Sequence, residues 1–127
     1  MKIFELFEEV SQKDLSDVER FATNLWGRLG VDVRFSYHFI GRVNDPRNRK
    51  PITVGELIRL FRKEYEEYGK VIAHSDGEAV LKDALTSLNL PFVIKDENQG
   101  PDDKTMVAKT IMRKPNFQTS NHEYIVR

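Results

Sequence analysis

Apolar positions follow helical spacing through the first thirty residues, in two stretches. The first stretch predicts a short amphipathic helix over residues 1–10. The second predicts a helix that Asp14 or Ser16 caps, that runs to Leu29 and that Gly30 ends, because glycine readily takes the left-handed conformation that closes a helix. The apolar stripe of this second helix consists of Val18, Phe21, Ala22, Leu25, Trp26 and Leu29.

The period then changes to two, which predicts a strand over residues 31–37. Helical spacing returns directly afterwards in a turn that places His38 and Arg42 together on its outer side, since residues four apart share a helix face. Pro46 ends this turn because proline cannot continue a helix. The inward positions of the turn are Phe39, Ile40 and Val43.

Thr53 and Glu56 form a capping-box pattern, which predicts a helix that starts here and runs to about Ile72. Charged residues are expected to fill its outer face. The expected buried stripe consists of Leu57, Leu60, Phe61, Tyr65, Tyr68 and Ile72.

The second half of the chain has the alternation of strands. Residues 78–95 fit either a helix or strands, and we favour strands near 79–83 and over 90–94. After a loop over 96–103, alternating residues predict one long strand over 106–113. A regular strand of this length would carry Lys109 and Arg113 side by side on one face.

A last short strand is possible over residues 123–126. Helices in the first half and strands in the second predict an α+β fold, with N-terminal helices packed on a small antiparallel sheet of about four strands.

Composition limits the class of protein. The chain has 127 residues, of which 39% are apolar and 31% charged, so we expect a single soluble domain over residues 1–127, with 1–12 as a possible separable N-terminal helix or targeting peptide. The chain has no cysteine, which excludes disulfides, thiolate metal sites and cysteine nucleophiles. No apolar run approaches the roughly 20 residues of a membrane span, so no membrane association is expected.

Charge is balanced in total but not along the chain. Twenty basic and twenty acidic side chains cancel, yet residues 28–63 contain nine Lys and Arg against three Asp and Glu, and residues 104–127 contain five against one. If these two segments meet in the fold, the molecule has a local positive face suited to an anionic partner, although ordinary solvated surfaces would explain the same charges.

The sequence has no glycine-rich phosphate loop, nucleophile elbow, zinc helix or calcium loop. The three histidines, His38, His74 and His122, share no metal-ligand spacing, so neither a metal nor a cofactor is expected.

Among these histidines, His38 stands beside Arg42 in the basic part of the chain. An imidazole can exchange a proton with a ribose hydroxyl or a leaving oxygen, and cations can stabilise charge on a phosphate. The alternative is local pairing of Arg42 with Asp45 or Asp32. The candidate catalytic set is His38, Arg42, Lys109 and Arg113, and the candidate nucleic-acid ligands are Arg47, Arg49, Lys50 and Lys114.

The polar string Asn44-Asp-Pro-Arg-Asn48 has two interpretations. Asn and Asp favour turns and Pro fixes a turn dihedral, so the string could be purely structural. A binding or active-site loop is the alternative.

Four segments, taken together, resemble a family of small proteins of tailed bacteriophages, from about Asp17 to Asn121. The order of helix, His-x-x-x-Arg, helix and a sheet with a basic-Thr strand is also similar to the phage branch of the barnase/EndoU/RelE-like nucleases. The four segments are His38 to Asn48, Glu78 to Asp83, Leu90 to Ile94 and Val107 to Phe117.

The second resemblance implies metal-independent RNA cleavage in the host cytoplasm, with His38 as general acid or base and Arg42, Lys109 or Arg113 on the phosphate. It also implies that Thr110 could be a site hydroxyl, whereas strand alternation places Thr110 on the buried face.

The competing hypothesis is a non-catalytic phage accessory protein that binds a host protein or nucleic acid. Residues 1–9 are similar to the peptides that load proteins into phage heads, so packaging in the virion is a further possibility.

Overall fold

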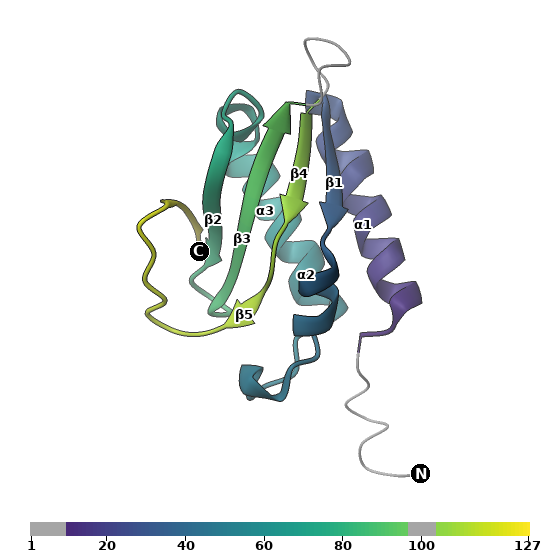
Figure 1. Ribbon diagram of the computed structural model, residues 1–127, viewed down its shortest axis with the longest axis vertical. Coiled ribbons are helices and arrows are strands. Elements are labelled where there is room, and N and C mark those ends of the chain that lie inside the picture. Colours follow the sequence, from purple (N-terminus) through teal and green to yellow (C-terminus); the bar gives the residue numbers. More distant parts are fainter. Residues whose placement is uncertain (1–9, 97–103) are drawn as a thin grey trace.

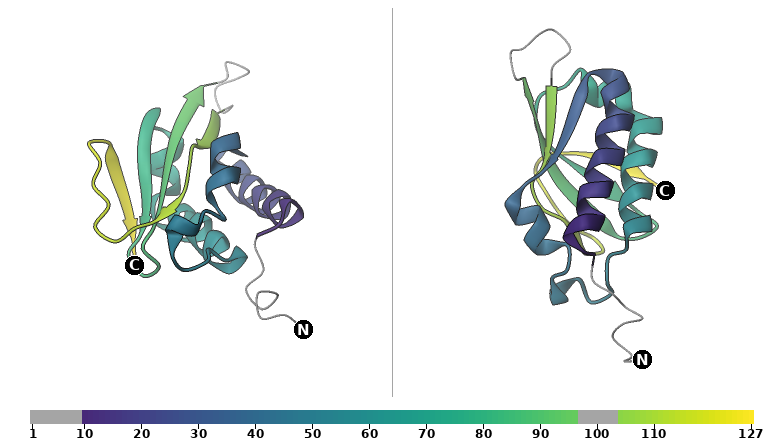
Figure 2. Two further views of the ribbon diagram at one scale, coloured as in Figure 1. Left: turned by 60° about the horizontal axis from the view of Figure 1, so that its bottom comes forward. Right: turned by 90° about the vertical axis from the view of Figure 1, so that its right-hand side faces the viewer.

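Two long helices cover one face of a single sheet, which gives the molecule two layers (Figures 1 and 2). The structure, a computed structural model, describes residues 10–96 and 104–127. Helices and sheet are both present in these residues, so the α+β class predicted from the sequence is confirmed. The helix predicted over residues 1–10 and the greater part of the loop predicted over 96–103 lie outside the described residues.

The first helix, α1 (Gln12–Trp26), starts earlier than predicted because Ser11 is its cap. The Ser11 hydroxyl accepts a hydrogen bond from the Asp14 amide at 3.0 Å, and the Asp14 carboxylate accepts one from the Ser11 amide at 3.1 Å. The α-helix ends at Trp26, before the predicted Leu29, and the chain continues through a 3-10 turn, η2 (Gly27–Leu29), which Gly30 closes with a left-handed φ of 76°.

The capping box at Thr53 and Glu56 is confirmed and opens α3 (Val54–Ala73). The buried stripe of α3 is close to the predicted one, but it also contains Glu64, an acidic residue that the predicted stripe did not include. Tyr65 and Tyr68 are only partly buried and pack against the edge of the core. The fully buried apolar residues of α3 are Leu57, Leu60, Phe61 and Ile72.

Within the described residues, the sheet has six strands in the order β1-β4-β3-β2-β6, with β5 paired to β3; Figure 1 labels β1 to β5, and the left view of Figure 2 shows the C-terminal strand β6 in yellow beside β2. Both the prediction of an antiparallel sheet and that of about four strands need correction. The β1–β4 and β2–β6 pairs are parallel, whereas β3 pairs antiparallel with β2, β4 and β5. The strands are β1 (Val31–Phe35), β2 (Gly77–Asp83), β3 (Leu88–Asp96), β4 (Lys104–Ala108), β5 (Met112–Arg113) and β6 (His122–Val126).

Both parallel pairs join strands that a long stretch of chain separates. A short hairpin turn forces antiparallel pairing, and only β2 and β3 are joined by one among the described residues. The direction of β1 beside β4, and of β6 beside β2, depends instead on which edge of the sheet is available, which local sequence does not encode.

The long strand predicted over residues 106–113 is interrupted. Ala108 pairs with Phe92 and Met112 pairs with Asn89, so three residues, 109–111, lie opposite only two residues of β3. This one-residue bulge reverses the alternation of side chains beyond it. Lys109 therefore shares a face with Val107, and Arg113 shares the helix-covered face with its partner Leu88, so the two cations do not lie side by side.

Pro91 accounts for the position of the bulge. The Lys109 amide donates to the Pro91 carbonyl at 2.8 Å, but proline has no N–H to donate in return. The carbonyl of Lys109 accepts a hydrogen bond from the Ser36 hydroxyl at 2.7 Å instead. The broken ladder thus connects the sheet to the segment that follows β1.

None of the helices in the described residues is long and apolar enough to cross a membrane.

Candidate functional site

A short helix, α2 (Tyr37–Arg42), brings the predicted histidine to the bulge (Figure 1). Ser36 caps α2 by accepting from the Phe39 amide at 3.0 Å, and the same hydroxyl donates to the Lys109 carbonyl. Because Ser36 begins a helix, Tyr37 belongs to α2 and not to the preceding strand as predicted. Phe39 is fully buried as expected and anchors α2 in the core.

A hollow of about 690 Å³ lies between α2, the following polar loop and the bulge. Two segments far apart in the sequence, 38–49 and 110–115, line it. Asp45 is the only acidic side chain among the described residues of its lining. The basic side chains that line it are His38, Arg42, Arg47, Arg49, Arg113 and Lys114.

Two side-chain links hold the walls of this basic hollow together. Ser36 joins the start of α2 to the bulge, as described above. On the other side, the buried Asn48 side chain donates to the Arg42 carbonyl at 3.0 Å and accepts from the Arg113 amide at 3.0 Å. Because Asn48 joins the end of α2 to β5, it sets the width of the hollow.

His38 and Arg42 lie on the same side of α2, as predicted. His38 is exposed, and Arg42 forms an ion pair with Asp45 at 3.2 Å. Arg47 pairs with the same carboxylate at 2.8 Å. The local pairing of Arg42 with Asp45 that the sequence left open is therefore present. However, Arg42 and Arg47 share this one carboxylate, so the three side chains together have a net positive charge.

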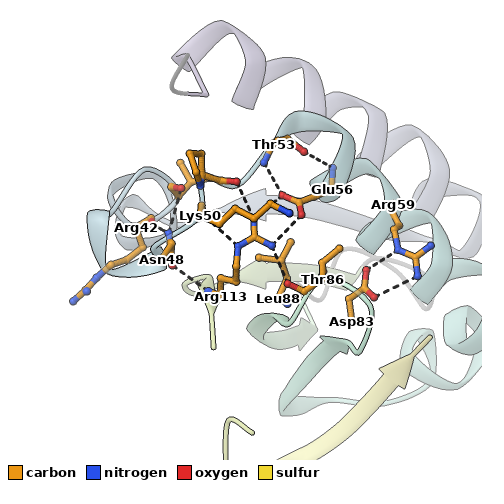
Figure 3. Close-up of polar contacts among 12 residues, drawn as sticks. Arg42, Asn48, Lys50, Thr53, Glu56, Arg59, Asp83, Thr86, Leu88 and Arg113 are labelled. Atoms are coloured by element: carbon orange, nitrogen blue, oxygen red, sulfur yellow. Dashed lines mark hydrogen bonds and ion pairs between the residues drawn. The ribbon is translucent and has the colours of Figure 1, made fainter. Parts of the chain in front are cut away.

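Arg113 also lines the hollow, but its guanidinium is fully engaged (Figure 3). Two of its N–H groups donate to the Glu56 carboxylate, at 2.7 and 2.9 Å. The other three donate to the backbone carbonyls of Lys50, Pro51 and Thr86. A guanidinium has five N–H donors, so none is left for a phosphate, and the predicted catalytic role of Arg113 is corrected to a structural one.

The contact with Arg113 also affects its acidic partner. Burial alone would raise the pKa of Glu56, but hydrogen bonds from Arg113 and the Thr53 amide, with the charges of Arg113 and Lys50, outweigh burial and lower the pKa below its ordinary value. Glu56 is therefore a charged anchor of the α3 N-terminus.

Lys109 and Lys50, also predicted as site residues, do not line the basic hollow. Lys109 forms an ion pair with Glu78 of β2, on the face of the sheet that the helices leave open. Lys50 lines a smaller neighbouring hollow of about 200 Å³. The side-by-side placement of Lys109 and Arg113 is thus wrong, and the bulge is the reason.

The polar string Asn44 to Asn48 is largely explained by structure. The side-chain amide of Asn44 donates to the Val10 carbonyl at 2.9 Å and accepts from the Val10 backbone N–H at 3.0 Å. These two bonds hold the start of the described chain in place. Asp45 caps the 3-10 turn η3 (Pro46–Asn48) by accepting from the Arg47 amide at 2.8 Å. The turn interpretation therefore accounts for the side chains of Asn44, Asp45 and Asn48.

Backbone strain marks the next residue. Arg49 has φ 64° and ψ −64°, and the Lys50 amide donates to the Asn48 carbonyl at 2.6 Å, which together define a γ-turn of the strained form. A non-glycine residue in this region costs on the order of 1–3 kcal/mol. This γ-turn places the exposed Arg49 side chain at the edge of the basic hollow.

Replacing Arg49 with glycine is expected to raise the free energy of unfolding by about 1 kcal/mol, because glycine adopts positive φ without steric cost. Urea unfolding measures the effect. Arg47→Gly is the matched control: Arg47 is an exposed neighbour in a 3-10 turn, where glycine should lower stability. A lower stability of Arg49→Gly than of the wild type would show that the γ-turn stores no strain.

Thr110 is a lining residue of the basic hollow that strand alternation had placed outside it. Strand alternation predicted that it is buried with Met106 and Met112, but Thr110 lines the basic hollow because the bulge changes the direction of the chain. Ser36, which holds one wall, was not predicted as a site residue, and Asn48, which holds the other, was named only within the polar string whose role the sequence left open. Pro91 in the middle of an apolar strand was the available signal, since proline there is typical of a bulge.

The remaining histidines lie apart from this site. The His74 ring nitrogen Nδ1 contacts the Lys70 carbonyl at 2.7 Å at the end of α3, and His122 contacts the ring of Tyr124 in β6. In the part of the chain that the structure describes, no three His, Asp or Glu side chains are grouped so that they could hold a metal ion.

Chemically, the basic hollow offers one imidazole, a hydroxyl and several cations, which suits an anionic ligand with a proton to transfer. In comparisons with known proteins, no family model, no curated protein sequence and no solved structure matched the chain.

Proposed function

We propose that the chain is a phage-encoded, metal-independent endoribonuclease that acts on single-stranded RNA in the host cytoplasm. One observation carries the proposal: His38 shares a hollow with several cations from two distant segments, against one acidic side chain among the described lining residues. The balanced total charge is no obstacle, because a local positive surface is enough to hold a few phosphates.

His38 would act on the ribose. It takes the proton of a 2′-hydroxyl while the 2′-oxygen forms a bond to the adjacent phosphorus, and the bond from phosphorus to the 5′-oxygen breaks. The proton that His38 carries is then available to the leaving 5′-oxygen. The products of this balanced step are a 2′,3′-cyclic phosphate and a 5′-hydroxyl.

The cations would act on the phosphate. Negative charge grows on its oxygens during the step, and prepositioned donors stabilise that charge. Arg42 lies on the same side of α2 as His38, and Arg49 and Lys114 are exposed and form no ion pair among the described residues. Arg47 contributes at the rim, and Thr110 supplies a hydroxyl that can donate to a phosphate oxygen.

The test is cleavage of single-stranded RNA by the purified chain in the presence of a chelator. We expect products that end in a 2′,3′-cyclic phosphate, and we expect His38→Ala to abolish cleavage. His122→Ala is the matched control, because His122 is an exposed histidine that does not line the basic hollow. Thermal unfolding of both variants should match the wild type, which separates chemistry from folding.

Other outcomes would favour the competing hypothesis. Binding of RNA without cleavage would support an accessory protein that binds nucleic acid. Cleavage that survives His38→Ala would count against the assigned mechanism. The absence of both RNA binding and cleavage would favour a protein partner.

A further inference from the structure

An apolar groove lies on the other side of α2 from the basic hollow. Its volume is about 440 Å³, and it lies between α1 and α2. Successive residues of a helix are about 100° apart, so Tyr37, Ile40 and Gly41 face this groove while His38 and Arg42 face the basic hollow. The short helix α2 is therefore a ridge between a basic and an apolar site.

Tyr37 is the most unusual side chain of this groove. It is 94% exposed, and Ile40 is 39% exposed, although the sequence predicted that Ile40 faces inward. A large aromatic ring that packs on nothing gains no stability for the fold from burial. Its position one residue before His38 places it about 1.5 Å along the helix axis from the proposed catalytic residue.

The other walls of the groove suit an uncharged planar group. Leu15 and Phe35 provide apolar surface. The Glu19 carboxylate accepts from the Phe35 amide at 2.8 Å and is thus already partnered. Gln12 and Ser16 are exposed at the rim, and neither side chain has a hydrogen bond to another described residue, so both can bind polar edges.

We propose that this groove binds a nucleobase of the same RNA strand whose phosphate occupies the basic hollow, with the base stacked on Tyr37. This inference rests on the proposed function. The division of surfaces supports a nucleotide over an apolar peptide, because a nucleotide joins an anionic group to a flat neutral ring, and the α2 ridge has a cationic surface on one side and an aromatic side chain on the other. Stacking on an aromatic ring tolerates every base, so little sequence preference follows.

The first experiment measures binding of a 2′-O-methyl RNA oligonucleotide, which lacks the attacking hydroxyl and cannot be cleaved by the proposed route. Fluorescence anisotropy should show that Tyr37→Ala weakens binding about tenfold, since stacking of one base on an aromatic ring has an effect of this order. Tyr37→Phe should bind as the wild type does. Leu85→Ala is the control, because Leu85 is a 72% exposed apolar residue far from α2 in the sequence.

The second experiment detects stacking directly. In Tyr37→Trp, emission of the new exposed indole should be quenched by the oligonucleotide but not by an abasic oligonucleotide of the same length or by inorganic phosphate. The native Trp26 is fully buried, and the wild type provides its background signal.

The outcomes separate the two proposals. Binding that needs Arg49 and Lys114 but is unchanged in Tyr37→Ala would overturn the base site and leave the nuclease proposal standing. Absence of oligonucleotide binding by the wild type would overturn both. A change in the oligomeric state of the RNA-free chain in Tyr37→Ala, measured by sedimentation, with unchanged RNA affinity would show that a second copy occupies the groove.

Discussion

Glu64→Gln is expected to stabilise the folded chain by about 3 kcal/mol at pH 7. Glu64 lies on the buried side of α3 with no exposed surface, and neither carboxylate oxygen has a hydrogen-bond partner among the described residues. Burial is the largest cause, and with the nearby carboxylates of Glu67 and Asp83 acting in the same direction it raises the pKa of Glu64 from 4.5 to about 9. The folded chain therefore keeps a proton here that the unfolded chain loses.

The direction of the pH dependence follows from this difference. Between pH 4.5 and about 9 the unfolded chain binds one proton fewer at Glu64 than the folded chain, so stability falls as pH rises, by about 1.4 kcal/mol for each pH unit. The contribution of Glu64 is fully present below pH 4.5 and is lost as pH approaches 9. Glutamine has no proton to lose, so the variant should lack this decline.

Urea unfolding of both proteins from pH 4.5 to 8.5 measures the effect. The free energies of unfolding of the wild type and of Glu64→Gln should agree near pH 4.5 and differ increasingly at higher pH. Glu67→Gln is the matched control: Glu67 is one turn away on α3, is partly exposed and pairs with Lys63 at 3.4 Å, so its loss should change stability by less than about 1 kcal/mol. Parallel pH profiles of wild type and Glu64→Gln would show that Glu64 is charged in the folded chain.

Arg113→Met is expected to destabilise the chain by about 3–5 kcal/mol, which is a large part of the stability of a domain of this size. The side chain of Arg113 is only 10% exposed and joins β5, the loop before α3, the first turn of α3 and the turn after β2 (Figure 3). Without it, the Glu56 carboxylate stays largely buried without its cation, and three carbonyls lose their donor.

Chemical denaturation at pH 7 measures this loss, with Arg47→Met as control. Arg47 is also an ion-paired arginine of the basic hollow but is 72% exposed, so its replacement should change stability by about 1 kcal/mol or less. Adding Glu56→Gln to Arg113→Met should restore part of the loss, because the unpaired charge is removed. Arg113→Met as stable as Arg47→Met would show that the buried ion pair contributes nothing.

Much of the local structure could be predicted from the sequence. The Thr53 capping box, the left-handed Gly30 that ends the first helical segment and the strand beginning at Val31 depend on interactions within a few residues, and the structure has all three. The shared face of His38 and Arg42 also follows from helical spacing alone. Errors at this level were small shifts of boundary, such as the cap at Ser11.

The misplaced site residues have a different origin. Lys109, Arg113 and Thr110 were assigned by strict alternation along one strand, and a single extra residue near Pro91 turned Arg113 to the face opposite that of Lys109 and brought Thr110 to the basic hollow. The free carbonyl that this bulge leaves is taken by Ser36, a contact across 73 positions of the chain. The hydrophobic pattern of a short segment cannot predict a hydrogen bond between residues so far apart in the sequence.

The sequence by itself therefore determined most of the helices and strands, the α+β class and the placement of an imidazole and a guanidinium on one helix face, because backbone propensity, capping and periodicity act over a few residues. Only the tertiary structure decided the strand directions, the consumption of all five donors of Arg113 and the burial of Glu64. These features depend on contacts between residues that are distant in the sequence and on how far each contact excludes water. Such contacts form only when the helices pack on the sheet.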